Sequence, residues 1–169
     1  ALPRHHVKSE VTSFGWTAGT LTNADGDVLM GRNYDFKNNT SAMLVYCAPK
    51  SGFRSVATAA LYNVSANAPD DSAKMNRASL TAPYICLDGL NEKGVSIAVL
   101  TLDSDPVHQN TGQPAIATTL AIRLVLDRAA STEEAVELLR GYDLFASSGR
   151  DSPSHITDAT RAGRVVEYD

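Results

Sequence analysis

The sequence predicts a single α+β domain, because short strand-like segments come first, helical segments follow, and two strands end the chain. Apolar alternation broken by turn residues fills most of the first hundred positions, as is typical of strands. Helical character appears only between residues 118 and 140. A chain of 169 residues buries about 70% of its unfolded surface, so it forms a core without metal or disulfide support.

The first predicted element is a β-hairpin. Residues 16–22 and 28–34 read as strands on either side of residues 23–27, where Asp25-Gly26 is a hairpin signal. Further strands are expected at the following residues: 42–48, 55–61 and 95–102, with a loop at 63–77 and a turn at 88–94.

Two helices are expected at residues 118–129 and 132–140. Ser131 followed by Glu134 is a capping box for the second helix, and Gly141 ends it. The last strands are predicted at residues 155–158 and 164–168. We expect strands 16–22, 28–34 and 95–102 to share one sheet, with both helices on one of its faces.

Composition excludes several functions. A net charge of -4 without a basic block argues against nucleic acid as a partner. Membrane spanning is also excluded, because no apolar run approaches the roughly 18 residues that a bilayer requires. Cys47 and Cys86 lie in apolar surroundings, which favours buried thiols and a cytoplasmic location. The pair His5-His6 lies in an arm-like segment, and we expect no metal there.

The usual catalytic motifs are absent. There is no Walker loop, GxGxxG, HExxH or GxSxG. Ser154, His155 and Asp158 are not expected to form a triad, because strand alternation places His155 and Asp158 on opposite faces.

Three segments, in this order, resemble the choloylglycine hydrolase and penicillin V acylase family of linear amide C–N hydrolases. They are Gly-Asp-Val-Leu-Met-Gly-Arg-Asn-Tyr-Asp at 26–35, Leu-Asp-Gly-Leu-Asn-Glu-Lys-Gly-Val at 87–95, and Thr-Leu-Ala-Ile-Arg-Leu-Val-Leu-Asp at 119–127. The strand Val-Val-Glu-Tyr at 165–168 is similar as well. The resemblance implies an αββα sandwich of the N-terminal-nucleophile hydrolase type, a small-molecule amide substrate and no cofactor.

The resemblance also implies a mechanism. In this family, processing makes a cysteine the first residue; its thiolate attacks the amide carbonyl, and its own α-amine moves the protons. Arg32 matches the arginine that favours the thiolate, and Asp35 the aspartate that holds the amine. Thr101 falls where a backbone N–H enters the oxyanion hole. Asp88 and Asn91 match a turn near the site, which we interpret as structural.

This sequence departs from the family at the nucleophile. The position sixteen residues before Arg32 holds Trp16, whose indole has one N–H donor and cannot attack a carbonyl. Thr17 is an alternative nucleophile, although its side chain would face the other side of the strand.

The family's chains are about twice this length. We therefore expect residues 1–15 to be a leader or arm, and residues 16–169 to be the N-terminal half of an amide-hydrolase domain. The expected partner is a second chain or a C-terminal half, or a second copy of this chain. The resulting prediction is an amide-hydrolase descendant that is inactive as written. A non-catalytic binding protein and an acyltransferase of the same fold remain alternatives.

Overall fold

The computed structural model describes residues 15–35, 41–61, 80–101, 108–146 and 152–168. The predicted loop at 63–77, the end of the strand at 102 and the His5-His6 pair lie outside these residues.

The predicted hairpin is confirmed. Strands β1 (Gly15–Thr22) and β2 (Val28–Asp35) pair antiparallel. The side chain of Asn23 holds the connecting turn, because its Oδ1 accepts hydrogen bonds from the N–H groups of Asp25 (3.0 Å) and Asp27 (2.8 Å). Gly26 has a φ of 91°, which glycine adopts without strain.

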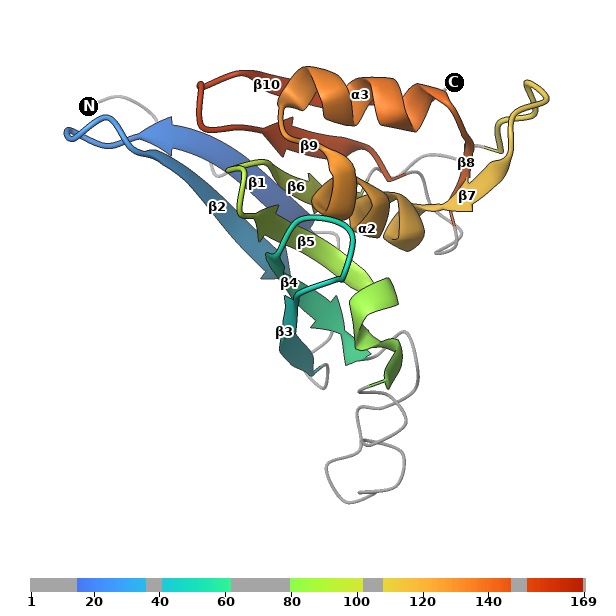
Figure 1. Cartoon of the computed structure of the whole chain (residues 1–169), viewed down its shortest axis with the longest axis horizontal. Helices are drawn as coiled ribbons and strands as arrows, with labels where there is room; N and C mark the ends of the chain where they lie inside the picture. Colours follow the sequence, from blue (N-terminus) through green and yellow to red (C-terminus); the bar gives the residue numbers. More distant parts are fainter. Residues whose placement is uncertain (1–14, 36–40, 62–79, 102–107, 147–151, 169) are drawn as a thin grey trace, which may run out of the picture.

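The main sheet has six antiparallel strands in the order β10-β9-β6-β5-β4-β3 (Figure 1). Their bounds are β3 Ala42–Cys47, β4 Ser55–Ala60, β5 Cys86–Asn91, β6 Ser96–Val99, β9 Ser154–Thr157 and β10 Gly163–Val166. A short 3₁₀ helix, η2 (Ala82–Tyr84), precedes β5. Strands β7 (Ala115–Ala117) and β8 (Asp143–Phe145) form a small parallel pair.

Both predicted helices are present. Helix α2 (Thr118–Arg128) packs on β5 and β6, and α3 (Thr132–Arg140) packs on α2, β9 and β10. Ser131 caps α3, since its hydroxyl accepts a hydrogen bond from the N–H of Glu134 (3.1 Å). The Glu134 carboxylate reaches back to the N–H of Ala130 (2.8 Å).

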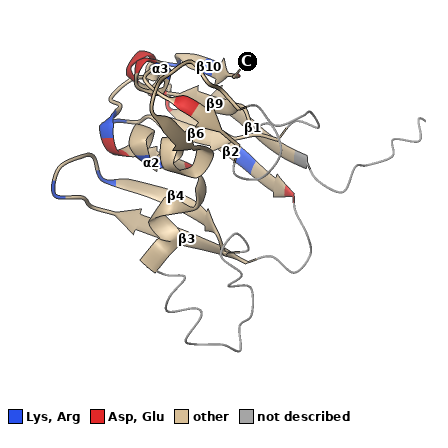
Figure 2. Cartoon of the chain, turned by 90° about the vertical axis from the view of Figure 1, so that its right-hand side faces the viewer, with Lys and Arg blue, Asp and Glu red and all other residues tan. Residues whose placement is uncertain are grey.

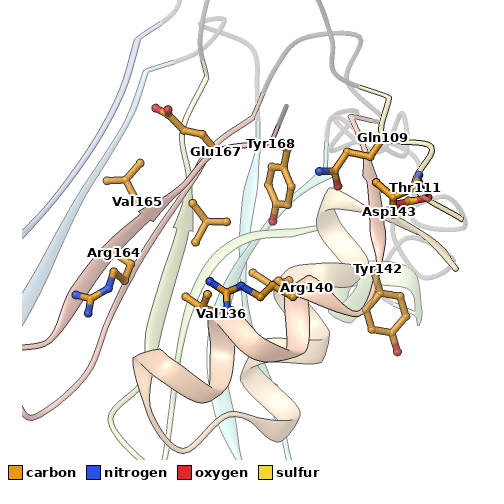
Figure 3. A pocket seen from close by; sticks show the side chains of 12 residues that line it. Gln109, Thr111, Val136, Arg140, Tyr142, Asp143, Arg164, Val165, Glu167 and Tyr168 are labelled. Atoms are coloured by element: carbon orange, nitrogen blue, oxygen red, sulfur yellow. Dashed lines mark hydrogen bonds between the residues drawn. The ribbon is translucent and has the colours of Figure 1, made fainter. Parts of the chain in front are cut away.

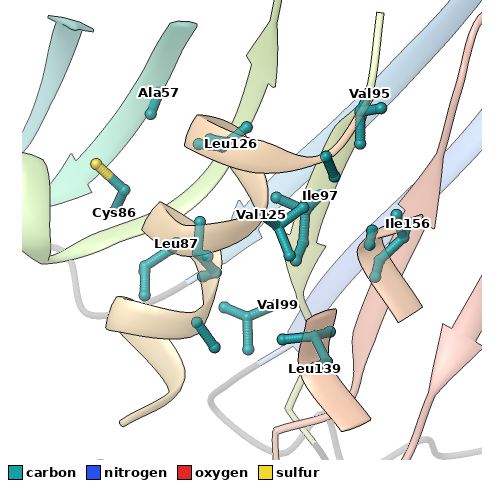
Figure 4. Close-up of a cluster of buried hydrophobic side chains, with 14 of the residues drawn as sticks. Ala57, Cys86, Leu87, Val95, Ile97, Val99, Val125, Leu126, Leu139 and Ile156 are labelled. Carbon is teal, nitrogen blue, oxygen red and sulfur yellow. The ribbon is translucent and has the colours of Figure 1, made fainter. Parts of the chain in front are cut away.

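The core lies between these helices and one face of the six-stranded sheet (Figure 4). Ile97, Val125, Leu126 and Ile156 are fully buried there. Gly89 on β5 lets α2 approach, because a Cβ at this position would lie 2.6 Å from a Leu126 methyl carbon.

The prediction that strands 16–22, 28–34 and 95–102 share one sheet is wrong. The hairpin forms its own two-stranded sheet, whereas β6 belongs to the six-stranded sheet. The hairpin lies across the face that the helices leave open (Figure 2). The reason is its half-buried face, which carries Trp16, Arg32 and Tyr34 and packs against the main sheet instead of extending it.

A second correction concerns the predicted turn at 88–94. Asp88 to Asn91 continue strand β5, and the turn begins only at Glu92. Asn91 ends the strand because its Oδ1 accepts hydrogen bonds from the N–H groups of Lys93 and Val95, both at 3.0 Å.

Candidate active site

Arg32 and Trp16 lie together on the inner face of the hairpin. In the strand register Trp16 is opposite Tyr34 and Arg32 is opposite Ala18, so all four side chains share one face. The guanidinium carbon of Arg32 is 5.1 Å from the centroid of the Trp16 ring and 6.0 Å from that of Tyr34. The two rings are 5.5 Å apart. The structure thus places the Arg32 guanidinium beside residue 16.

Asp88 on β5 holds this arginine from the main sheet. The Arg32 Nε donates to Asp88 Oδ2 at 3.4 Å, and the two side chains are only 9% and 12% exposed. Asp88 Oδ1 also accepts from the N–H of Thr58 (3.2 Å), where the β4–β5 register is irregular. Burial lowers the pKa of Arg32, against the raising effect of Asp88.

One donor of Arg32 stays open. The Nη2 atom is buried and has no hydrogen-bond partner among the described residues, while Nη1 donates to the Asn33 carbonyl (3.4 Å). Leaving a buried charged donor unsatisfied is costly, and such donors are common at sites that bind another group. This open donor marks the space around Trp16 as a candidate site.

The other residues expected at the site lie differently. Asp35 pairs with Gly15 at the end of β2 and is exposed on the face opposite Arg32. Thr17 is exposed on that same outward face. Thr101 is half-buried, two residues beyond β6. The structure therefore places Trp16 and Arg32 on one face of the hairpin and the Asp35 side chain on the other.

The side chain of Asn91 makes contacts that stabilise the fold. Its side-chain amide donates to the carbonyl groups of Leu126 (3.2 Å) and Ala129 (2.8 Å), which lie in the last turn and cap of α2. With its two accepted bonds in the turn, Asn91 fastens β5 to this helix.

Sequence reasoning missed two features of the region. Tyr34 packs beside Trp16 with the two rings tilted by 38°, and its place on the same strand face as Arg32 was a usable signal. His155 on β9 shares a 2.9 Å hydrogen bond with the Thr20 hydroxyl on β1. Burial lowers the pKa of His155. No sequence pattern links these two residues, which are joined only by the stacking of the two sheets.

Neither cysteine lies on the hairpin that carries Trp16 and Arg32. Cys86 is buried and points to the Ala82 carbonyl at 3.3 Å, and burial raises the pKa of its thiol to about 12. Cys47 lies on β3, outside the Arg32–Trp16 cluster.

A cavity of about 450 Å³ lies elsewhere, between α3 and β10 (Figure 3). Arg140 and Arg164 line it, and none of the predicted site residues does. Within the described ranges no three His, Cys, Asp or Glu side chains cluster as metal ligands would. No helix there is long and apolar enough to span a bilayer.

The layers define the class of protein. A six-stranded antiparallel sheet carries helices on one face and a β-hairpin on the other, which makes the chain a layered α+β protein. Residues 17–169 match the model of the linear amide C–N hydrolases, choloylglycine hydrolase family. The chain belongs to this family.

Solved structures agree in fold. Two variants of the conjugated bile acid hydrolase from Clostridium perfringens match with TM-scores of 0.59, at 20% and 21% identity, over 90% and 89% of this chain. The penicillin V acylase from Agrobacterium tumefaciens matches at 0.60 and 18% identity over 90% of this chain. The matches cover 46–47% of those proteins, so the chain spans about half their length. No curated protein sequence matches it.

Proposed function

We propose that this chain forms one half of a linear-amide C–N hydrolase domain, with Arg32 as its active-site arginine, and that Trp16 leaves it without hydrolytic activity. The observation that carries the proposal is the position of Arg32, buried against residue 16 with an open donor at Nη2.

The chemistry follows from that position. A thiolate at residue 16 would face a guanidinium that is largely removed from water, and a nearby cation stabilises the thiolate form. An indole has no comparable lone pair. Trp16 therefore occupies the position of the nucleophile but cannot attack a carbonyl carbon. We assign Asp35 to the nucleophile's amine and the Thr101 N–H to the oxyanion hole, as the family resemblance implies.

The proposed substrate is a linear amide of the classes that the neighbours' names describe, bile-acid conjugates and penicillin V, or an N-acyl amide. The two Clostridium perfringens structures carry their substitutions at a cysteine and at an arginine sixteen positions further on. Trp16 and Arg32 are separated by the same number of residues, which supports the assignment of Arg32.

A non-catalytic binding function is the second candidate. The Trp16 and Tyr34 rings pack in a tilted arrangement with centroids 5.5 Å apart, and Arg32 lies beside both rings. Such a group of aromatic faces and one buried cation suits an acyl ligand with a carboxylate or carbonyl oxygen. This function would keep the Arg32 site and dispense with the nucleophile.

The test is the thiol pKa of a Trp16→Cys variant, measured from the pH dependence of alkylation in a Cys47→Ser background. We expect a pKa clearly below the ordinary value of about 8.5, because the new thiolate would face Arg32. Adding Arg32→Met should return it to the ordinary range.

Thr17→Cys is the matched control. It is the neighbouring residue on the exposed face, so its thiol should titrate normally. An ordinary pKa for Trp16→Cys, or a depressed pKa only for Thr17→Cys, would show that Arg32 does not serve a nucleophile at residue 16. Circular dichroism spectra confirm that each variant is folded.

A further inference from the structure

Asp88 reaches the hairpin from the middle of the main sheet. Gly89 packs against α2 and Asn91 bonds to the end of that helix, so alternation along β5 directs Asp88 to the opposite face. The β4–β5 register shifts at this point, between Thr58 and Ala59. Such irregularities are common next to active sites, where they re-aim a side chain. The backbone of the main sheet thus turns one carboxylate toward the hairpin.

Both oxygens of this carboxylate are used. Oδ1 accepts from the N–H of Thr58 at 3.2 Å, and Oδ2 accepts from the Nε of Arg32 at 3.4 Å. The Arg32 Nη1 is turned to the Asn33 carbonyl at 3.4 Å, which leaves Nη2 as the donor without a partner among the described residues. Asp88 therefore decides which edge of the guanidinium stays free beside the Trp16 ring.

The buried charges are not needed to join the two layers. Taking two charges out of water is costly, and apolar side chains of similar size often hold buried surfaces together equally well. Removing only the aspartate would leave the Arg32 cation buried without a counter-charge, so its guanidinium would turn toward water. The position of Arg32 beside residue 16 thus depends on Asp88.

We propose that Asp88 is a positioning residue of the Arg32 site. It touches no reacting atom; it holds the guanidinium beside residue 16 so that Nη2 can face a thiolate or a substrate oxygen. This inference rests on the proposed function, because it concerns what Arg32 does for a nucleophile at residue 16.

The thiol pKa of Trp16→Cys in the Cys47→Ser background tests the role when Asp88→Asn is added. The two possible roles of Asp88 predict opposite signs. If Asp88 positions Arg32, losing it moves the guanidinium away, and the thiol pKa should rise by about 1 toward its ordinary value. If Asp88 is only a nearby negative charge, its removal favours the thiolate, and the thiol pKa should fall.

Ser55→Ala is the matched control for lost stability. The Ser55 hydroxyl is buried on β4 and accepts from Arg123 Nη2 at 2.8 Å, so its loss weakens the main sheet without touching Arg32. This variant should leave the thiol pKa unchanged. A thiol pKa that is already ordinary in Trp16→Cys contradicts the proposed function itself. A depressed pKa that Asp88→Asn lowers or leaves unchanged overturns only the positioning role.

Tryptophan fluorescence gives a second readout with residue 16 unmodified, because Trp16 is the only tryptophan of the chain. Asp88→Asn should shift its emission maximum in the same direction as Arg32→Met, since both remove the guanidinium from the indole face. Emission identical to that of the unmodified chain would overturn the proposal.

Asp88→Glu keeps the counter-charge and serves if Asp88→Asn does not fold. Its longer side chain displaces the carboxylate, so it should raise the thiol pKa less than Asp88→Asn but in the same direction. A thiol pKa equal to that of Trp16→Cys with Asp88 intact would count against the positioning role.

Discussion

Arg32 on β2 and Asp88 on β5 form the ion pair that joins the hairpin to the main sheet. Their Nε and Oδ2 atoms are 3.4 Å apart, and both side chains are about nine-tenths buried. The residues are 56 positions apart in sequence. The same contact orients the arginine that we assign to the active site.

Asp88→Asn should destabilise the chain by about 3 kcal/mol, because it leaves the Arg32 cation buried without a counter-charge. The amide oxygen can still accept from Thr58, so the loss reports on the ion pair. Urea unfolding measures it. Glu92→Gln, which disrupts the solvent-exposed pair with Arg54, should change the free energy of unfolding little. Equal effects of the two substitutions would mean that burial of the Arg32–Asp88 pair is unimportant.

Gly89→Ala should destabilise the chain by about 1–3 kcal/mol through overpacking. The new methyl group would meet a Leu126 side chain at 2.6 Å and the Val56 carbonyl at 2.9 Å. Gly19→Ala on β1 is the control, because nothing lies within 4 Å of a Cβ there. Thermal unfolding measures the melting temperatures of the two variants, and only that of Gly89→Ala should fall. An unchanged melting temperature for the Gly89→Ala variant would show that α2 does not lie this close to β5.

The chain should not hydrolyse N-acyl amino acids, conjugated bile salts or penicillin V, because residue 16 has no nucleophilic atom. Activity is measured as the release of the free amine product, which is quantified by chromatography. Restoring a cysteine alone with Trp16→Cys should not create turnover, since the thiol would still lack a free α-amine as its base. Turnover that Thr17→Ala abolishes would make Thr17 the nucleophile and give the hairpin a different active register.

Asp158 should make stability sensitive to acid. Burial raises the pKa of its carboxyl, but hydrogen bonds from the Thr160 hydroxyl and the Thr132 N–H outweigh this and hold the pKa at about 2. Because the folded-state pKa lies below the unfolded value, the stabilisation is present above about pH 4 and is lost as pH falls toward 2.

The comparison variant for this effect is Asp158→Asn. Its free energy of unfolding should be lower near neutral pH and should fall less steeply between about pH 4 and pH 2. Asp25→Asn, in the exposed hairpin turn, should follow the unmodified chain. Parallel acid curves for all three proteins would rule out this role of Asp158.

Local patterns in the sequence determined the hairpin, the two helices and the cap at Ser131, because each depends on residues within a few positions of one another. The proximity of Trp16 and Arg32 was also predictable, because the register of the two hairpin strands places residue 16 next to residue 32 on one face. The family motifs led to the prediction that Arg32 belongs to an active site, because hydrophobic periodicity carries no information about catalysis.

Tertiary structure alone decided how the sheets are layered. Alternation shows that one face of the hairpin is half-buried, but it does not show whether that face packs against a second sheet or whether the strands extend the first. The same ambiguity hid the Arg32–Asp88 ion pair and the Thr20–His155 bond, since both cross between sheets. It also led to a turn being predicted at Asp88, because a polar residue in strand β5 is explained only by its buried partner on β2.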